Sequence, residues 1–525
     1  MSELVKSSGA MALATLISRI LGMVREIVYA RFMGDGWVAG AFQLAFLVPN
    51  LFRRLLGEGA LTAAFIPIFK EKEKTAGQSE MWRAANAVVS GLVLASVVVV
   101  LTVVVGITIF LASGVSVPRE TLLMLRLLRI MFPYMIFVCL AAVFMGMLNA
   151  RGYFFVPAMG ATVLNVVMIA SVLLVAPLMG ATLEEQIFAL AIGVLVAGIG
   201  QAIFQLPALY KEGYRPRWVT PVGNEVVIRT VQQMIPGMLG VAAFQINVLI
   251  TQSMAFGVDA SIVASYNYAV RLMEFPQGVF GVSIATYLLP TLAGLVAEKK
   301  YLEYKQLLRE GVAHLIFVNL FASAMLVVLA EPTVRLLFER GRFGPDSTLR
   351  VAFALQCLAP GLVAFSAVNI FARAFYALSD TSTPMKIGVC SLGLNLVLTY
   401  LWLSLFPMGY KQGAMGLANT MTSVANATIL VFALTKKVGG LDLKATFRDI
   451  KISILGTIVA SILAATTWCG LKRTIGYETF LTRVMGVALP GGLAMVVYFW
   501  IGIKFRCNPA IQVARTIISR LPFKK

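Results

Sequence analysis

Fourteen apolar stretches, each long enough to cross a bilayer, dominate the sequence and limit what it can fold into. A hydrocarbon core of about 30 Å needs about 20 predominantly apolar residues in a helix. The chain is 59% hydrophobic and only 13% charged, and backbone polar groups in lipid are satisfied by helices. The sequence therefore predicts an all-α polytopic membrane protein with 14 transmembrane helices: 8–32, 38–69, 82–112, 121–148, 155–178, 186–209, 227–256, 261–294, 311–330, 348–377, 385–406, 413–435, 452–470 and 480–503.

The distribution of lysine and arginine predicts how these helices are oriented. Most basic residues outside the apolar stretches fall in alternate loops and in the C-terminal tail, and such loops stay on the cytoplasmic side. Both termini are therefore expected in the cytoplasm. The net charge of +20 also raises nucleic acid as a partner, but the sequence has no long basic tract and no aromatic-basic module. Membrane topology explains the charge better.

A repeated spacing divides the chain into two related halves. Three pairs of prolines have the same separation along the sequence: Pro49 and Pro276, Pro133 and Pro360, Pro157 and Pro384. We call this separation the repeat spacing. An even number of helices in each half leaves both halves in the same orientation, so we interpret them as two parallel six-helix repeats.

The predicted domains follow from the repeat. They are an N-lobe at 1–222, a C-lobe at 223–438, and a third part at 439–525. This third part holds helices thirteen and fourteen and an amphipathic basic cytoplasmic tail. The two extra helices lie outside the repeat, so we expect them to serve another purpose.

Arginines inside the apolar stretches need a specific explanation. A charged side chain at the centre of a bilayer costs about 2.5–3.5 kcal/mol on insertion scales. Arginine outnumbers acid in the first repeat, and its planar guanidinium group binds phosphate oxygens bidentately. This surplus predicts an anionic substrate. The candidate substrate-binding residues are Arg19, Arg25, Arg53 and Arg271.

Few acidic side chains lie within the apolar stretches, and each is a candidate partner for an arginine. Arg54 and Glu58 are spaced i, i+4, and Arg271 and Glu274 are spaced i, i+3, so both pairs share a helix face. Glu26 follows Arg25 directly and meets it only obliquely. The remaining intramembrane arginines are interpreted as interfacial residues near helix ends: Arg31, Arg126, Arg129, Arg373 and Arg483.

The sequence contains no motif for catalysis or for nucleotide hydrolysis. It has no GxxxxGK[ST] loop, no cluster of nucleophile and base, and no cluster of metal ligands, and its five cysteines fall singly. We therefore expect a transporter and not an enzyme, driven by the membrane potential or by a monovalent cation. Several polar residues of the second repeat are able either to coordinate a cation or to hold helices together: Asn247, Asn395, Thr399, Asn419, Thr422 and Asn426.

Four stretches of the chain resemble the MurJ (MviN) lipid II flippases of the MOP transporter superfamily. They are SRILGMVREIVYARFMG at 18–34, FLVPNLFRRLLGEGALTAAFIPIF at 46–69, YNYAVRLMEFPQGVFGVSIATYLLPTL at 266–292 and FARAFYALSDTSTPMKIG at 371–388. The resemblance implies transport of undecaprenyl-pyrophosphate-linked peptidoglycan precursor from the cytoplasmic to the periplasmic leaflet of the bacterial inner membrane, by alternating access. It also implies that the four candidate arginines line the central cavity, and that helices thirteen and fourteen form a groove for the lipid tail.

The sequence departs from the family pattern at a few positions. Val270 and Gly40 stand where some members carry an acid, and Asn and Thr occur where some members bind sodium through acidic side chains. The expected partners are lipid II and membrane lipids, with cell-wall synthesis proteins as further candidates. Two alternatives stay open at this point. One is another exporter of the superfamily, for polysaccharide-lipid or drugs, and the other is a membrane scaffold for cell-wall synthesis.

Overall fold

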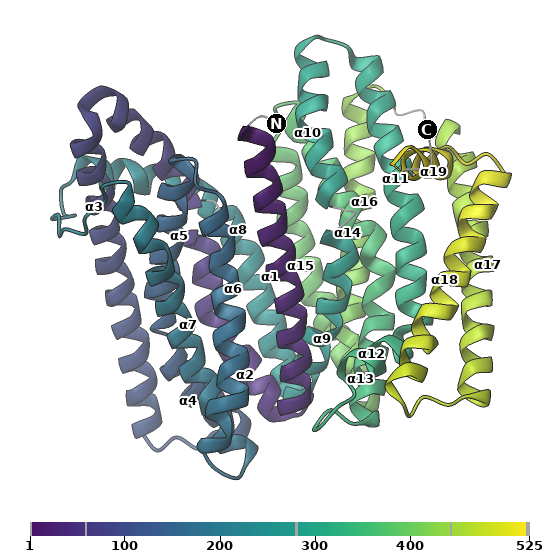
Figure 1. Cartoon of the computed structure of the whole chain (residues 1–525), viewed down its shortest axis with the longest axis horizontal. Coiled ribbons are helices and arrows are strands. Elements are labelled where there is room, and N and C mark those ends of the chain that lie inside the picture. The colour runs from purple at the N-terminus through teal and green to yellow at the C-terminus, as the bar shows by residue number, and fades with distance from the viewer. Residues whose placement is uncertain (1–2, 58–59, 279–281, 441–443, 521–525) are drawn as a thin grey trace. The chain divides into compact units, whose positions relative to one another are not determined.

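The computed structural model describes residues 3–57, 60–278, 282–440 and 444–520, which form helices and connecting turns without a β-strand (Figure 1). In chain order the helical elements are α1 (Glu3–Met33), α2 (Trp37–Phe52), the π-turn η1 (Arg53–Gly57), α3 (Ala60–Ala112), α4 (Arg119–Met131), α5 (Tyr134–Ala150), α6 (Phe155–Ala170), η2 (Ser171–Val175), η3 (Ala176–Leu178), α7 (Leu183–Lys211), α8 (Glu225–Val258), α9 (Ala260–Pro276), α10 (Val282–Ala297), α11 (Tyr301–Val328), α12 (Ala330–Phe338), α13 (Pro345–Leu358), η5 (Ala359–Gly361), α14 (Leu362–Ala377), α15 (Ser382–Leu405), η6 (Met408–Gly413), α16 (Ala414–Lys437), α17 (Lys444–Thr474), α18 (Phe480–Lys504) and α19 (Asn508–Arg520).

The described residues of all fourteen predicted spans are largely helical, which confirms the predicted fold class. Ten helical runs among the described residues are long and apolar enough to cross a membrane, and an eleventh is the pair α4 and α5, bent by 45°. Pro133 stands at that bend, where it cannot donate a helix hydrogen bond. The three other predicted spans are those that contain the candidate site arginines: 8–32, 38–69 and 261–294.

The first compact unit contains Met1–Ala264 together with the short segment Arg340–Phe343. Within it α1 packs on α6, α5 on α7, and α3 on both α5 and α8 (Figure 1). The α3 element is two helices joined at Gly77, whose φ of +85° lies in the left-handed region that glycine adopts without strain. The capping box of Thr182 and Glu185 fixes the start of α7.

The second compact unit contains Ser265–Glu339 and Gly344–Lys525. Its helices α17 and α18 lie side by side as a hairpin, and α17 also packs on α11 (Figure 1). The short helices α12 and α19 are additional to the fourteen predicted spans. The compact units divide the chain after Ala264, because α8 packs in the first unit. The repeat spacing places the lobe boundary at 222/223, and those domain bounds stay a prediction.

The hydrophobic cores of the two units share the repeat spacing of the prolines. Leu61 and Leu288 both lie in a core, one in each unit, and they are separated by this spacing. Eight further pairs of core residues are related in the same way: Phe65 and Leu292, Met81 and Leu308, Ala85 and Val312, Val88 and Leu315, Val143 and Ile370, Phe144 and Phe371, Met147 and Ala374, Leu148 and Phe375. Equivalent positions are therefore buried in both halves, as expected for two parallel six-helix repeats.

Candidate functional site

Arg25 is held in a fixed orientation between two helices of the first unit. Its Nη1 donates to Oδ1 of Asn165 on α6 at 3.1 Å, and its Nη2 donates to Oε1 of Glu26 at 2.5 Å. The Arg25 side chain is only 12% exposed, and its guanidinium carbon lies 5.4 Å from the centre of the Tyr29 ring. Asn165 is itself fixed, because its Nδ2 donates to the carbonyl oxygen of Ser18 at 3.2 Å.

One donor of this arginine is unused. Among the described residues, the Nε of Arg25 is buried and has no hydrogen-bond partner. A buried donor without a partner costs about 1–3 kcal/mol, so it normally has a function or a ligand. Glu26 is 8% exposed and neutralises part of the charge. The ion pair between Arg25 and Glu26 confirms Glu26 as a supporting partner of this arginine.

Arg19 precedes Arg25 on α1, by six residues or about 9 Å along the helix axis. Its side chain is exposed, and within the described part of the chain it makes no hydrogen bond or ion pair. An arginine in this setting is available to bind an anion. Arg19 therefore differs from Arg25, whose charge is already partly neutralised.

Arg53 begins the π-turn η1, directly after α2 and four residues after Pro49. Its Nε donates to Oδ1 of Asn50 at 2.7 Å, and its side chain is half-buried. A π-turn inside a helical run is uncommon and frequently marks a functional site. Arg54 lies in the same turn. Its predicted partner Glu58 falls outside the described residues, so that ion pair stays a prediction.

Arg271 lies on the part of α9 that belongs to the second unit. Its Nη1 donates to Oε2 of Glu274 at 2.8 Å, as the i, i+3 spacing suggested. Both side chains are close to half exposed, at 43% and 45%. The structure thus describes three candidate arginines in the first unit and one in the second, each in its own surroundings.

A polar cluster in the second unit joins α9, α15 and α16. Nδ2 of Asn395 donates to Oδ1 of Asn419 at 3.4 Å and to Oγ1 of Thr422 at 3.3 Å. Nδ2 of Asn419 donates in turn to the hydroxyl of Tyr266 at 2.9 Å. The Oγ1 of Thr399 is buried without a partner among the described residues. Searched over those residues, the chain has no group of three or more His, Cys, Asp or Glu suited to a metal ion.

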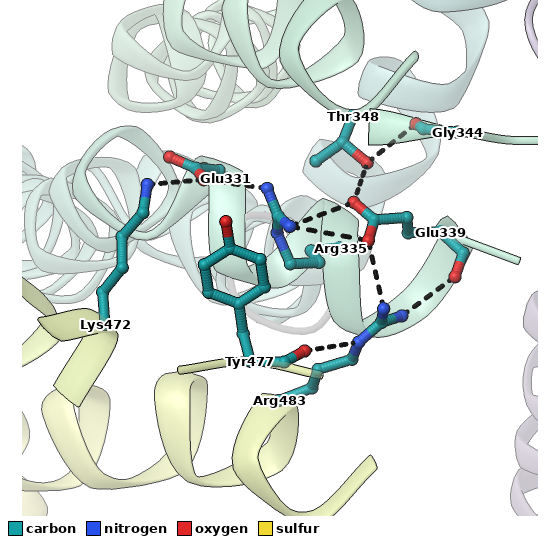
Figure 2. Close-up of polar contacts among 8 residues, drawn as sticks. All are labelled: Glu331, Arg335, Glu339, Gly344, Thr348, Lys472, Tyr477 and Arg483. Atoms are coloured by element: carbon teal, nitrogen blue, oxygen red, sulfur yellow. Dashed lines mark hydrogen bonds and ion pairs between the residues drawn. The ribbon is translucent and has the colours of Figure 1, made fainter. Parts of the chain in front are cut away.

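Sequence reasoning missed a buried ion network in the second unit, which Figure 2 shows. Arg335 on α12 is 7% exposed and pairs with Glu331 at 3.0 Å and with Glu339 at 3.5 Å. Glu339 also pairs with Arg483 of α18 at 3.1 Å, and Glu331 with Lys472 of α17 at 3.1 Å. Glu331, Arg335 and Glu339 have i, i+4 spacing, the signal that could have identified the network.

Arg483 lies near the start of α18, as predicted, but its side chain does not reach outward. Its side chain is only 18% exposed and pairs with Glu339 inside the second unit. Besides the ion pair, it donates to the carbonyl oxygens of Tyr477 at 3.0 Å and Glu339 at 2.9 Å. An arginine near a helix end reaches outward only when no buried acid is within reach, and Glu339 supplies such an acid.

Comparison with known proteins gives consistent matches along the chain. The family model described as Lipid II flippase MurJ matches residues 29–485. The chain is 31% identical over 523 residues to the probable lipid II flippase MurJ of Vibrio cholerae, covering 96% of this chain and 97% of that protein. It is 33% identical over 506 residues to the probable lipid II flippase MurJ of Rhizobium meliloti, covering 95% and 93%.

Solved structures agree on the fold. A structure of the lipid II flippase MurJ in an inward closed conformation superposes with a TM-score of 0.77 at 21% identity, covering 94% of this chain and 98% of that one. An inward-facing multidrug transporter of the MATE family, in the MOP superfamily, superposes with a TM-score of 0.64 at 13% identity, covering 82% and 98%. At these identities the likeness extends to the fold alone.

Proposed function

The chain belongs to the MurJ family of lipid II flippases, and from this premise we propose that Arg19, Arg25, Arg53 and Arg271 bind the pyrophosphate of lipid II during transport. Lipid II is an undecaprenyl-pyrophosphate-linked peptidoglycan precursor, so the protein is a transporter of cell-wall biogenesis and not an enzyme. It is a multi-pass membrane protein of bacteria.

The unused Nε of Arg25 is the observation that carries the arginine proposal. Asn165 and Glu26 fix the guanidinium group before a ligand arrives, so little side-chain entropy remains to be lost on binding. Arg19 adds a charge without an ion-pair partner among the described residues. Arg53 is held by Asn50 at a π-turn, which places a further guanidinium group within a helical run.

We propose a direction of transport from the family resemblance and the predicted orientation, and the charge of the headgroup is consistent with it. We place the protein in the inner membrane with both termini in the cytoplasm, and lipid II leaves the cytoplasmic leaflet for the periplasmic one by alternating access. The pyrophosphate is anionic, so a membrane potential that is negative inside favours its outward movement. Each elementary charge gains about 2.3 kcal/mol per 100 mV.

We propose two alternative sources of energy for this cycle. One is the membrane potential, which acts directly on the anionic headgroup. The other is a monovalent cation. The cluster of Asn395, Asn419 and Thr422 supplies neutral oxygen atoms of the kind that hard cations bind. Contact with cell-wall synthesis proteins stays a prediction.

The test is the appearance of lipid II on the outer leaflet of bacteria depleted of their own flippase. The parent chain should restore it, whereas Arg25→Ala and Arg53→Ala, at equal membrane abundance, should lower it by at least about tenfold, since each removes a charge-assisted contact worth about 1.5–3 kcal/mol. Arg119→Ala is the matched control. Arg119 is a 71% exposed arginine of α4 that pairs with Glu184, and its loss should leave transport unchanged.

Each outcome separates one proposal from another. Normal transport by both variants would disprove the arginine site while leaving the flippase assignment intact. Failure of the well-inserted parent to restore lipid II would contradict the assignment itself and favour an exporter of another lipid-linked sugar or of drugs. A scaffold for cell-wall synthesis would keep its function in both arginine variants and show no lipid II movement in purified vesicles.

A further inference from the structure

Glu339 follows the end of α12 and has three side-chain partners. Its carboxylate accepts from Arg335 at 3.5 Å, from Nη2 of Arg483 at 3.1 Å and from Oγ1 of Thr348 at 2.8 Å (Figure 2). The Glu339 side chain is only 10% exposed. These partners come from α12, α13 and α18, so one carboxylate at the end of a short helix is fixed from three elements.

The two arginines fix more than the carboxylate. Nη1 of Arg483 donates to the backbone carbonyl of Glu339 at 2.9 Å, and its Nε donates to the carbonyl of Tyr477 in the α17–α18 loop at 3.0 Å. The guanidinium carbon of Arg335 lies 3.9 Å from the centre of the Tyr477 ring. Thr348 also donates to the carbonyl of Gly344 at 3.3 Å. The two residues that flank the segment 340–343, Glu339 and Gly344, are therefore both held by side chains, and Figure 2 shows these contacts.

That segment packs in the first unit and makes a specific set of contacts there. The backbone N–H of Arg342 donates to the carbonyl of Arg31 at 3.0 Å. Its Nη1 donates to the carbonyl of Phe32 at 2.8 Å, and both terminal nitrogens donate to Oε1 of Gln186 at 3.2 Å. One short segment thus contacts the end of α1 and the start of α7.

Two glycines make this close approach feasible. Gly341 has a φ of +61° and Gly34 a φ of +62°, both in the left-handed region that favours glycine. A Cβ added to Gly341 would lie 2.5 Å from the carbonyl oxygen of Arg31, and one added to Gly34 would lie 2.8 Å from that of Arg342. The conformation of the segment is therefore specific, and it depends on how its ends are held.

We propose that Arg335 and Arg483 are positioning residues for transport, which act through Glu339 to hold segment 340–343 in the conformation that grips α1 and α7. The proposal extends the function stated above and depends on it only where transport is measured. Glu339 holds the segment and does not bind substrate. A bidentate arginine fork fixes the carboxylate and the backbone carbonyl of the same residue, and an ammonium group does this poorly.

Amide hydrogen exchange tests the grip directly, because the Arg342 N–H is one of the groups that form it. Deuterium uptake at 340–343 is measured on the full chain in lipid nanodiscs. Arg483→Gln should raise the exchange rate there by about tenfold, through easier local opening. Arg483→Lys should restore part of the protection. Exchange in the distant loop at 151–153 should stay unchanged, which distinguishes positioning from general destabilisation.

Lys472→Gln is the matched control. Lys472 belongs to the same network but pairs with Glu331, and among the described residues it has no hydrogen bond or ion pair with Glu339. Its loss should leave exchange at 340–343 unchanged. Thr348→Val is the milder variant if Arg483→Gln does not insert. It removes one hydrogen bond to Glu339 at nearly constant volume and should raise exchange by about threefold.

Transport of lipid II, measured in depleted bacteria at equal membrane abundance, should fall in Arg483→Gln and recover in part in Arg483→Lys. Unchanged exchange in both Arg483→Gln and Thr348→Val would overturn the proposal. Faster exchange with normal transport would overturn the functional half of it. If the parent chain moves no lipid II, the flippase assignment fails, while the exchange measurement still decides whether Arg483 holds the segment.

Discussion

The two units each bury a core at equivalent positions of the repeat, but they differ in the polar contacts that hold the loops between their helices. In both units core residues lie at equivalent positions, related by the repeat spacing. The loop that follows the fourth predicted span carries a different charge in each repeat. In the first unit this loop supplies a base, Arg151, and in the second it supplies an acid, Asp380.

The first unit's loop is held by side chains from two elements, α3 and the end of α7. Arg151 forms an ion pair with Glu73 of α3, and its Nε donates to Oε2 of Glu212, which follows α7, at 2.7 Å. The hydroxyl of Tyr153 donates to the same Glu212 at 2.8 Å. Nζ of Lys70 donates to Glu73 at 2.8 Å. Loss of any one member leaves the others partly satisfied, which is the advantage of a network.

The second unit's loop depends on a single pair of charges. Nζ of Lys437, at the end of α16, donates to Oδ2 of Asp380 at 2.5 Å. Among the described residues, Asp380 otherwise accepts only from Thr383, which follows it closely in the chain. Tyr153 and Asp380 are related by the repeat spacing, so the repeat preserves the position of the contact but not its chemistry. Packing is thus the part of the repeat that both halves retain.

The largest effect on stability is expected from substitutions at equivalent core positions of the two units. Phe144 and Phe371 are equivalent, and each is 5% exposed. Phe144→Ala and Phe371→Ala should each lower the free energy of unfolding by about 3–5 kcal/mol, because each leaves a cavity. Thermal unfolding of the purified protein measures this. Phe110→Ala, at a side chain 40% exposed, is the control and should have little effect. A difference of more than about 2 kcal/mol between the two core variants would mean that the cores are not equivalent.

A smaller effect is expected at the loops. The Arg151 side chain is only 23% exposed and makes two ion pairs. Arg151→Ala should therefore lower the free energy of unfolding by about 1–2 kcal/mol. The lysine that pairs with Asp380 is 40% exposed, and Asp380→Ala should cost less than about 1 kcal/mol.

Hydrogen exchange of each loop measures the local change. Arg83→Ala, which breaks an exposed pair with Glu80, is the control and should change nothing. If Arg151→Ala and Asp380→Ala changed exchange in their loops equally, the ion network of the first unit would stabilise its loop no more than the single ion pair of the second.

The helical spans were predictable from the sequence for a physical reason. Apolar length and proline spacing are local or periodic signals, and the bilayer forces such stretches into helices. The i, i+4 spacing of Glu331, Arg335 and Glu339 is visible in the sequence, but the contacts of Glu339 with Thr348 of α13 and Arg483 of α18 are not. The four arginines could be proposed as a site because charge within an apolar stretch is visible without knowing its neighbours, and their role in binding stays a prediction.

Other features needed the structure. The partner of Arg25 on α6, Asn165, is 140 residues away, and no spacing rule connects them. The grip of Arg342 on Arg31 and Gln186 depends on two left-handed glycines, and glycine is too common in this chain to be a signal by itself. Long-range polar contacts are set by how helices pack, and helix patterns do not encode that choice.

A third prediction concerns how the stabilising effect of these ion pairs changes as pH falls. The hydroxyl of Tyr153 and the guanidinium of Arg151 hold the pKa of Glu212 below its ordinary 4.5, and Lys437 with Thr383 lowers the pKa of Asp380 from 3.8 to about 2. A lowered pKa stabilises the folded state above the ordinary value and ceases to do so as pH falls through the folded one. The difference in melting temperature between parent and Arg151→Ala should therefore be constant from pH 7 to 5 and shrink below 4.5. For Asp380→Asn the difference should persist to lower pH. Loss of either difference between pH 7 and 5 would contradict these assignments.

The smallest effect is expected when the two partners of an ion pair are exchanged, and this experiment best distinguishes the single pair from the network. Asp380→Lys alone places two lysines together and should lower the free energy of unfolding. Adding Lys437→Asp should return the free energy of unfolding to within about 0.5 kcal/mol of the parent value, because the described pair involves no third charge. The remaining loss reflects the two bonds from Thr383. Arg151→Glu combined with Glu212→Arg should show no such recovery, since a carboxylate at position 151 still faces Glu73.

Double-mutant cycles by thermal unfolding measure both exchanges. Recovery in both units would mean that Glu73 contributes nothing and that each loop depends on a single pair. Recovery of the free energy of unfolding in the second unit alone would show that a loop held by one ion pair accepts the two charges in either order. It would also show that the order is fixed in the first unit, where Glu73 is a third charge.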